Sequence, residues 1–251
     1  MIKTANIADM LKQEEDFLWV VDNFQSEKER FMESFIFDQY KGWEYLMALN
    51  DIRATYDWRE VLTIVDIGSR RSWFPFMLAL KYPNSTVWAT DIDSPDVYFT
   101  NGMPKTPPNL KFKQMFSEQT EMVFGKGQVD IITCMSVIEH IDKEIDSYWA
   151  MLNALRTNGI LLMSTDLCLG KTCNRVPNRY YNFQMLQRRF DIIGDTITTP
   201  PRSIDIETVD QQLKKMDDNR ELYHKLSDKV KGLFEFSDRN GLSAYWKMVR
   251  K

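Results

Sequence analysis

The sequence predicts an α/β protein built on a doubly wound, mostly parallel sheet of seven strands, with helices ahead of the sheet and a helical insertion before the last strand. From residue 61 onwards, short β-branched runs alternate with helical segments, and this alternation is typical of βαβ units. The first run is apolar almost throughout, as parallel strands buried on both faces are. Several runs end in an acidic or hydroxyl-bearing residue, and ligands of such sheets bind at those strand ends.

Residues 1–57 are predicted to form a helical region ahead of the sheet. Its apolar residues recur at spacings of four, four, three and four, which places them on one face of a helix packed against the sheet. Acidic residues dominate the segment upstream of this stripe. The stripe consists of Met32, Ile36, Tyr40, Trp43 and Met47 and is widened by Phe31 and Phe35.

Residues 58–251 are expected to form the domain that contains the sheet. The predicted strands are seven apolar runs at residues 61–67, 86–90, 110–116, 129–134, 160–165, 190–197 and 244–249. Helices are expected at residues 74–81 and after Asp142, whose carboxylate is a suitable N-cap, with Asn158 and Gly159 ending the second one. The segment of about 200–237 is predicted to be a charged helical insertion with a narrow apolar seam.

The composition is that of an ordinary globular protein and argues against several classes. The formal net charge of the 251 residues is −4, so nucleic acid is not an expected partner. No run of about eighteen apolar residues occurs, so no membrane contact is expected. Cys134, Cys168 and Cys173 are not in C-x-x-C spacing, which argues against zinc and favours reduced thiols in a cytoplasmic protein.

Four segments in a fixed order resemble the motifs of class I S-adenosylmethionine (SAM)-dependent methyltransferases. They are residues 65–68 (VDIG), 89–93 (ATDID), 129–141 (VDIITCMSVIEHI) and 155–162 (LRTNGILL). Their order and spacing are more specific than any one of them alone. The resemblance spans about residues 61–166 and implies a Rossmann-like methyltransferase fold, methyl-transfer activity and SAM as the cofactor.

The resemblance places the cofactor across the carboxyl ends of the first, second and fourth strands. A glycine such as Gly68 lets the backbone approach a ligand closely. In the family, the acid that ends the second strand accepts hydrogen bonds from both ribose hydroxyls, and Asp91 holds that place in preference to Asp93. The implied cofactor-binding residues are Asp66, Gly68, Ser69, Arg70, Asp91, Ile92, Phe116, Ser117, Cys134, Met135 and Ser136.

Three positions depart from the family pattern. The glycine-rich loop has a single glycine, and either Arg70 or Arg71 meets the SAM carboxylate or both are solvated. The usual acid at the end of the third strand is missing, and Phe116 there either stacks on the adenine or belongs to the core. Ser136 stands where the metal-binding pattern E-x-x-E-H has its first carboxylate, so no divalent metal is expected.

The sequence does not single out one catalytic residue, because methyl transfer is an in-line displacement at a carbon that the sulfonium already activates. A base is needed only where the acceptor must lose a proton. Three candidates are His140, which follows the fourth strand, and Tyr180 and Tyr181, which lie in a basic stretch. His140 is alternatively a histidine whose hydrogen bonds are satisfied within its own turn.

The expected acceptor is a small molecule, with a protein side chain second. The helices of residues 1–57 and the insertion of about 200–237 lie outside the common core of the family and are expected to form a lid over the crevice. A homodimer through the seam of the insertion is the alternative to that lid. A methyltransferase fold kept as a non-catalytic binding or scaffold module is the alternative function. A nicotinamide-dependent dehydrogenase is excluded, because no G-x-G-x-x-G follows the first strand.

Overall fold

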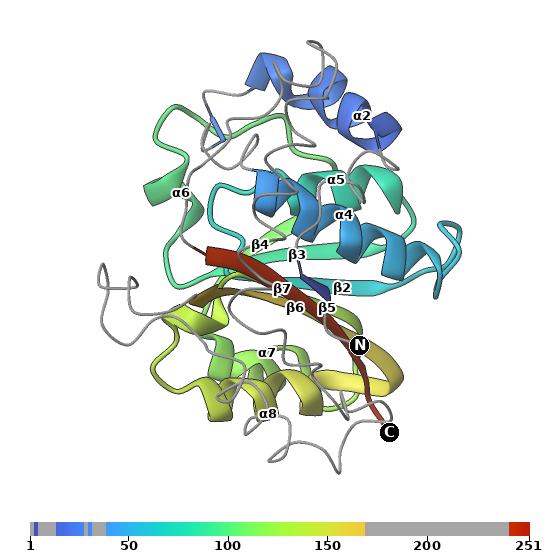
Figure 1. The fold of residues 1–251 in the computed structure, drawn as a ribbon, viewed down its shortest axis with the longest axis vertical. Coiled ribbons are helices and arrows are strands. Elements are labelled where there is room, and N and C mark those ends of the chain that lie inside the picture. The colour runs from blue at the N-terminus through green and yellow to red at the C-terminus, as the bar shows by residue number, and fades with distance from the viewer. Residues whose placement is uncertain (1–2, 5–13, 28–29, 32–38, 169–240) are drawn as a thin grey trace.

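The computed structural model describes residues 3–4, 14–27, 30–31, 39–168 and 241–251. Within these ranges, helices cover both faces of one sheet (Figure 1). The predicted strand at residues 190–197, the insertion of about 200–237 and the candidate residues Tyr180 and Tyr181 lie outside the described residues. In the described part of the chain, no helix is both long and apolar enough to cross a bilayer.

Within the described residues, the sheet has seven strands in the order β1-β7-β6-β5-β2-β3-β4. The five strands from β6 to β4 are parallel, whereas β7 is antiparallel to β6 and β1 is antiparallel to β7. The strands are β1 (Lys3–Thr4), β2 (Thr63–Ile67), β3 (Thr86–Asp91), β4 (Leu110–Gln114), β5 (Val129–Met135), β6 (Leu155–Cys168) and β7 (Gly241–Val249).

Six of these strands are the ones that the sequence predicts, and the seventh is not. β1 has two residues, which pair with Tyr245 and Ala244 of β7. So short a segment has no periodicity from which a strand can be predicted. β6 is also longer than expected and begins at Leu155, directly after the preceding helix. Its first residues pair irregularly with β5, because the register shifts between Val129 and Ile131.

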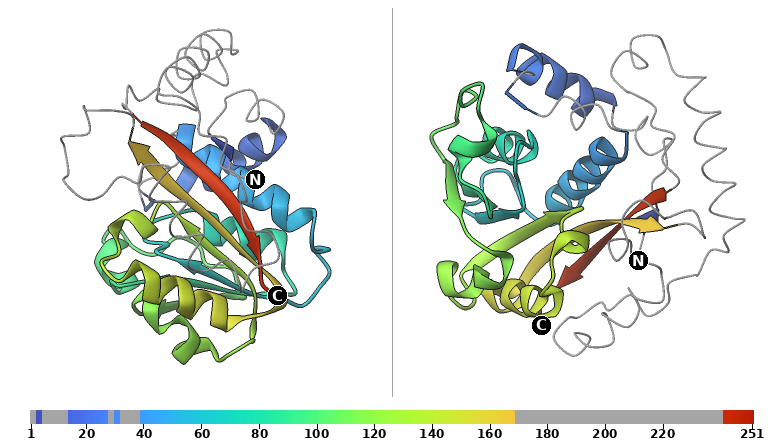
Figure 2. Two further views of the ribbon diagram at one scale, coloured as in Figure 1. Left: turned by 60° about the horizontal axis from the view of Figure 1, so that its bottom comes forward. Right: turned by 90° about the vertical axis from the view of Figure 1, so that its left-hand side faces the viewer.

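Two layers of helix enclose the sheet, as the two views of Figure 2 show. One layer contains α4 (Gln39–Arg53) and α5 (Phe74–Lys81), with α2 (Glu14–Phe24) and α6 (Pro95–Tyr98) beside them. The other contains α7 (Thr120–Phe124) and α8 (Glu144–Ala154). The described ranges also contain three 3-10 turns: η1 (Gln25–Glu27), η2 (Ser117–Gln119) and η3 (Ile138–His140).

The start of α5 agrees with the sequence, but that of α8 does not. The Ser72 hydroxyl accepts the backbone N–H of Phe74 at 3.0 Å, and Pro75 lies in the first turn of α5. The N-cap of α8 is Lys143, so the prediction that Asp142 caps this helix is wrong. The turn that follows η3 takes up residues 142 and 143, and the helix therefore begins one residue later than Asp142 would allow.

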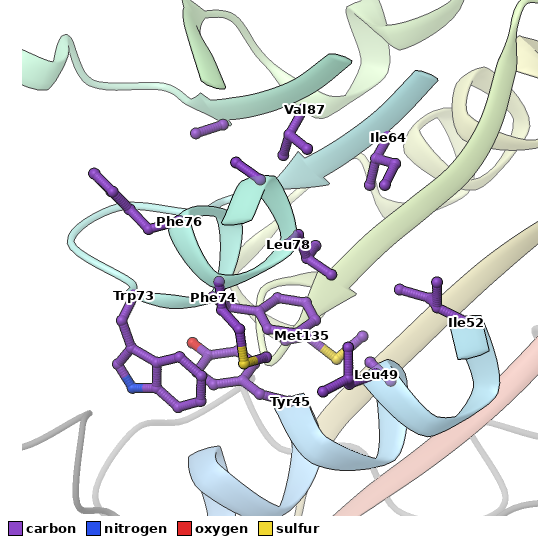
Figure 3. Close-up of a cluster of buried hydrophobic side chains, with 14 of the residues drawn as sticks. Tyr45, Leu49, Ile52, Ile64, Trp73, Phe74, Phe76, Leu78, Val87 and Met135 are labelled. Atoms are coloured by element: carbon purple, nitrogen blue, oxygen red, sulfur yellow. The ribbon is translucent and has the colours of Figure 1, made fainter. Parts of the chain in front are cut away.

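Helix α4, which precedes the first parallel strand, shares a hydrophobic core with the sheet and α5 (Figure 3). The ring of Tyr45 stacks on Phe74 with centroids 4.6 Å apart and meets Trp73 edge-on at 4.9 Å. Leu49 and Ile52 continue this contact along the helix. The aromatic packing fixes α4 over the sheet, with the first turns of the helix near the carboxyl end of β5.

Candidate functional site

The strand order creates a switch point between β2 and β5. From β2 the chain runs outwards through β3 and β4, and it then returns to β5 and runs through β6 on the other side. Parallel sheets bind ligands outside the carboxyl ends of the strands at such a point. The residues that follow β2 and β5 there are Gly68 and Ser136, and Asp91 ends β3. The structure therefore brings together the three strand ends that the sequence predicts to form one site.

The turn after β2 packs directly against the turn after β5. Gly68 has φ +69°, and a Cβ built on it would lie 2.4 Å from Cγ2 of Val137. Only glycine fits here, because an L side chain is strained at this φ and the side chain of Val137 already fills the space that a Cβ would need. The single glycine of the loop therefore stands at the position where the backbone requires one.

Arg70 also has a positive φ, of 40°, although it carries a side chain. Its backbone N–H donates to Oδ2 of Asp91 at 3.0 Å, which holds the turn in this conformation. Ser69 anchors the same turn, since its N–H and its hydroxyl both donate to the carbonyl of Thr90, at 2.9 and 3.2 Å. The loop thus keeps a left-handed residue at a second position without a second glycine.

The two arginines of the loop have different roles. The Arg71 side chain donates to the backbone carbonyls of Arg30 (3.0 Å) and Phe31 (3.3 Å) and so ties the N-terminal segment to the loop. The Arg70 side chain is exposed. Of the pair, Arg70 is therefore the one whose guanidinium remains available to a ligand carboxylate.

The Asp91 carboxylate is held from both sides at the end of β3. Oδ1 accepts the N–H of Asp93 at 3.1 Å, while Oδ2 accepts that of Arg70. Burial raises the pKa of Asp91, and the hydrogen bonds from the backbone oppose this effect. Asp93 is exposed, so the buried and oriented carboxylate of the pair is that of Asp91.

Asp66 adds a second buried carboxyl group. It is 3% exposed, and the Thr133 hydroxyl donates to its Oδ1 at 2.5 Å. Burial raises the pKa of Asp66 to about 7, and the negative charge of Asp91 adds to this shift. Within the described residues, neither carboxylate forms an ion pair with a lysine or arginine. A cationic ligand beside them would stabilise their ionised forms.

Tyr98 is a site residue that sequence reasoning missed. It is buried at the end of α6, whose first turn is capped by the Ser94 hydroxyl. Burial raises the pKa of Tyr98, and the nearby charges of Asp91 and Asp66 raise it further, while a hydrogen bond with Ser69 lowers it. The phenol therefore lies beside the two carboxylates. It belongs to no motif, and only the fold brings it to them.

The remaining predicted cofactor residues differ in exposure. Phe116 and Ile92 are 55% and 57% exposed, so the interpretation of Phe116 as a core residue is wrong. The Ser117 hydroxyl lies 2.8 Å from that of Ser147 in α8.

Cys134 is fully buried in the core on the α7/α8 face, and burial raises the pKa of its thiol. The thiol of Cys134 therefore points into this core, whereas the buried side chain of Met135 packs on the opposite, α4 face.

A cluster of polar side chains meets the end of β5. Ser136 has φ +50°, and its N–H donates to the Ser164 hydroxyl at 3.0 Å. Its own hydroxyl donates to Oε1 and Oε2 of Glu44, at 2.8 and 3.0 Å. Lys41 lies 3.3 Å from Oε2 of Glu44. Sequence reasoning missed Lys41 and Glu44, although two charged residues flanking Trp43 on the apolar stripe were a signal that could have identified them.

His140 is exposed at the end of η3, and its backbone N–H donates to Val137. Its position after β5 is the one that the sequence predicts. Among the residues that the structure describes, no three histidine, cysteine or acidic side chains come together as a set of metal ligands.

Comparisons with known proteins point to one fold. No family model matches the chain. A curated relative is the malonyl-[acyl-carrier protein] O-methyltransferase of Halalkalibacterium halodurans, which is 25% identical over 143 residues. The match covers 54% of this chain, and the chain spans about half (49%) of the length of that relative.

Solved structures resemble the chain over most of its length. The phosphoethanolamine N-methyltransferase 2 of Haemonchus contortus, in complex with SAM, has a TM-score of 0.55 and 16% identity, over 93% of this chain and 60% of that one. The geranyl diphosphate C-methyltransferase of Streptomyces coelicolor A3(2) has a TM-score of 0.54 and 14% identity, over 83% and 77%. The [4+2]-cyclase SpnF has a TM-score of 0.54 and 12% identity, over 99% and 98%. The chain therefore has the class I SAM-dependent methyltransferase fold, as its four ordered motifs predict.

Proposed function

We propose that the chain is a SAM-dependent methyltransferase that binds its cofactor across the carboxyl ends of β2, β3 and β5. The observation that carries this proposal is the Asp91 carboxylate, which is buried at the end of β3 and oriented by two backbone N–H groups. A carboxylate held in this way suits a diol, because each oxygen can accept one ribose hydroxyl. Gly68 lets the turn after β2 pack against the turn after β5, so the two turns border the same proposed site.

The charge of the site agrees with this ligand. SAM carries a sulfonium and an ammonium group, and both are cationic. Asp66 and Asp91 are buried carboxyl groups whose pKa values burial raises. A cation next to them offsets the cost of their ionisation. In this proposal, the exposed Arg70 binds the carboxylate of the same ligand, and the exposed Phe116 and Ile92 cover its adenine.

The proposed acceptor is a small molecule, with a protein side chain second. The name of the curated relative gives malonyl-[acyl-carrier protein] as its acceptor. The name of one structural neighbour gives geranyl diphosphate. In this proposal, residues 58–251 bind the cofactor and the helices of residues 1–57 cover the acceptor side. Non-catalytic use of the fold is the second candidate, favoured by the arginine at position 70 in place of a loop glycine.

S-adenosylhomocysteine (SAH), the demethylated cofactor, is expected to raise the melting temperature of the protein. A ligand that binds only the native state at a hundred times its Kd stabilises it by about 2.7 kcal/mol. For a domain of this size that corresponds to roughly 5–10 °C, which differential scanning calorimetry resolves. NAD at the same concentration is the control and should have no effect. Absence of a shift with SAH would refute the proposal. A shift without methyl transfer from SAM to any of a panel of acceptors would favour the non-catalytic alternative.

A further inference from the structure

Lys41 and Glu44 form a buried polar cluster with Ser136, one of the predicted cofactor-binding residues. Glu44 is 0% exposed, Lys41 is 6% exposed and Ser136 is 8% exposed. Replacing such a pair of charges with apolar side chains of the same volume is commonly neutral or stabilising. The cluster is therefore hard to explain by stability alone. Charged groups buried beside a ligand crevice are instead typical of functional sites.

The fold holds this cluster at the β5 side of the proposed site. Ser136 directly precedes Val137, which packs against the Gly68 turn. Glu44 reaches Ser136 from α4, the helix that the stacking of Tyr45 on Phe74 fixes over the sheet (Figure 3). Ser136 stands where the E-x-x-E-H pattern has its first carboxylate. The carboxylate of Glu44 reaches this same strand end from α4.

The hydrogen-bond directions give the two residues different tasks. The Ser136 hydroxyl has one hydrogen, and it donates this hydrogen to Glu44. The lone pairs of Ser136 Oγ therefore remain to accept a hydrogen bond from a ligand. A hydroxyl polarised by a carboxylate is a stronger acceptor than a free one. Ser136 is the more exposed of the two, so Glu44 meets a ligand through Ser136.

We propose that Ser136 and Glu44 form a proton relay for an acceptor with a protonated nucleophile, a hydroxyl or an amine. This inference rests on the proposed function. The acceptor heteroatom forms a bond to the methyl carbon, the carbon–sulfur bond breaks, and its electron pair stays on sulfur. The proton of the acceptor passes to Ser136 Oγ while the proton of Ser136 passes to Glu44. Lys41 stabilises Glu44 before the transfer. An acceptor that is already anionic, such as a carboxylate, needs no such relay.

Sinefungin tests the relay, because it carries a protonated amine where SAM carries its methyl group, whereas SAH has neither. We expect Ser136→Ala to weaken sinefungin binding about ten times more than it weakens SAH binding, which is the loss of one charge-assisted hydrogen bond. Glu44→Gln should also weaken sinefungin binding more than SAH binding, because it removes the charge that polarises Ser136. Calorimetric titration of both ligands gives both constants.

Asp51→Asn is the matched control, since Asp51 lies on the same helix but accepts the Tyr245 hydroxyl at 2.6 Å. It should change neither Kd. Ser136→Ala removes a single hydroxyl and keeps the test decisive if Glu44→Gln does not fold. If SAH binds and the ratio of the two constants is the same in wild type and Ser136→Ala, the relay is refuted and the proposed function stands. If the wild type binds neither ligand, the proposed function and the relay are both refuted.

Discussion

Gly68→Ala is expected to lower the free energy of unfolding by about 2–5 kcal/mol and to abolish measurable SAH binding. The left-handed conformation at φ +69° costs an L residue about 1–2 kcal/mol. The added Cβ would also lie 2.4 Å from Val137, and overpacking of this kind costs about 1–3 kcal/mol. Relief of the contact must separate the two turns that frame the proposed cofactor site. Urea denaturation measures the first effect and calorimetric titration the second.

Gly127→Ala is a matched control for the backbone strain alone. Gly127 has the same φ of +69°, and nothing lies within 4 Å of a Cβ built on it. It should therefore cost only about 1–2 kcal/mol and leave SAH binding unchanged. In the double variant Gly68→Ala/Val137→Ala, the nearest atom of residue 137 is its Cβ at 3.0 Å, and part of the lost stability should return. Equal losses for Gly68→Ala and Gly127→Ala would show that the contact with Val137 is unimportant.

Asp91→Ala is expected to weaken SAH binding by about 1.5–3 kcal/mol, or roughly 10- to 150-fold in Kd. The substitution removes both acceptors for the ribose hydroxyls, and it also leaves the N–H groups of Arg70 and Asp93 without their carboxylate partner. Calorimetric titration of the folded variant measures the loss.

Asp93→Ala provides the comparison. Asp93 is exposed and contacts Asp91 through its backbone N–H, which the substitution retains. The Kd of SAH should stay within about twofold of the wild-type value. A larger loss of SAH affinity for Asp93→Ala than for Asp91→Ala would show that the ribose binds Asp93 and not Asp91.

The strands and their ends could be predicted from the sequence because they depend on local patterns. Residues 63–67 and 129–135 are apolar runs, and a glycine or a polar residue follows each of them. Parallel pairing then requires that these ends meet at one edge of the sheet. Asp91 and Gly68 could be placed in this way before any contact was known.

The alternation of side chains along a strand held further information. Asp66, Thr133 and Met135 lie on the α4 face of the sheet, whereas Cys134 lies on the α8 face. Because neighbouring residues of a strand point to opposite faces, Cys134 could have been separated from Met135 by its position alone. The exposure of Phe116 does not follow from alternation, since Phe116 lies beyond the last residue of β4.

The contributions of Tyr98, Glu44 and β1 depend on tertiary structure. Tyr98 ends a helix of four residues, and β1 has only two. Glu44 lies 92 residues from Ser136 in the chain, and its role follows only once α4 has docked on the sheet. Side chains that reach a site from a separate element have no fixed spacing from the motifs of that site.

A crystal structure of the SAH complex tests the central claim most directly. We expect both ribose hydroxyls within hydrogen-bond distance of the Asp91 carboxylate, the ligand backbone against the Gly68 turn, and the sulfur beside Ser136 at the end of β5. SAH bound away from these three strand ends, or with its ribose on another residue, would contradict the assignment of this site.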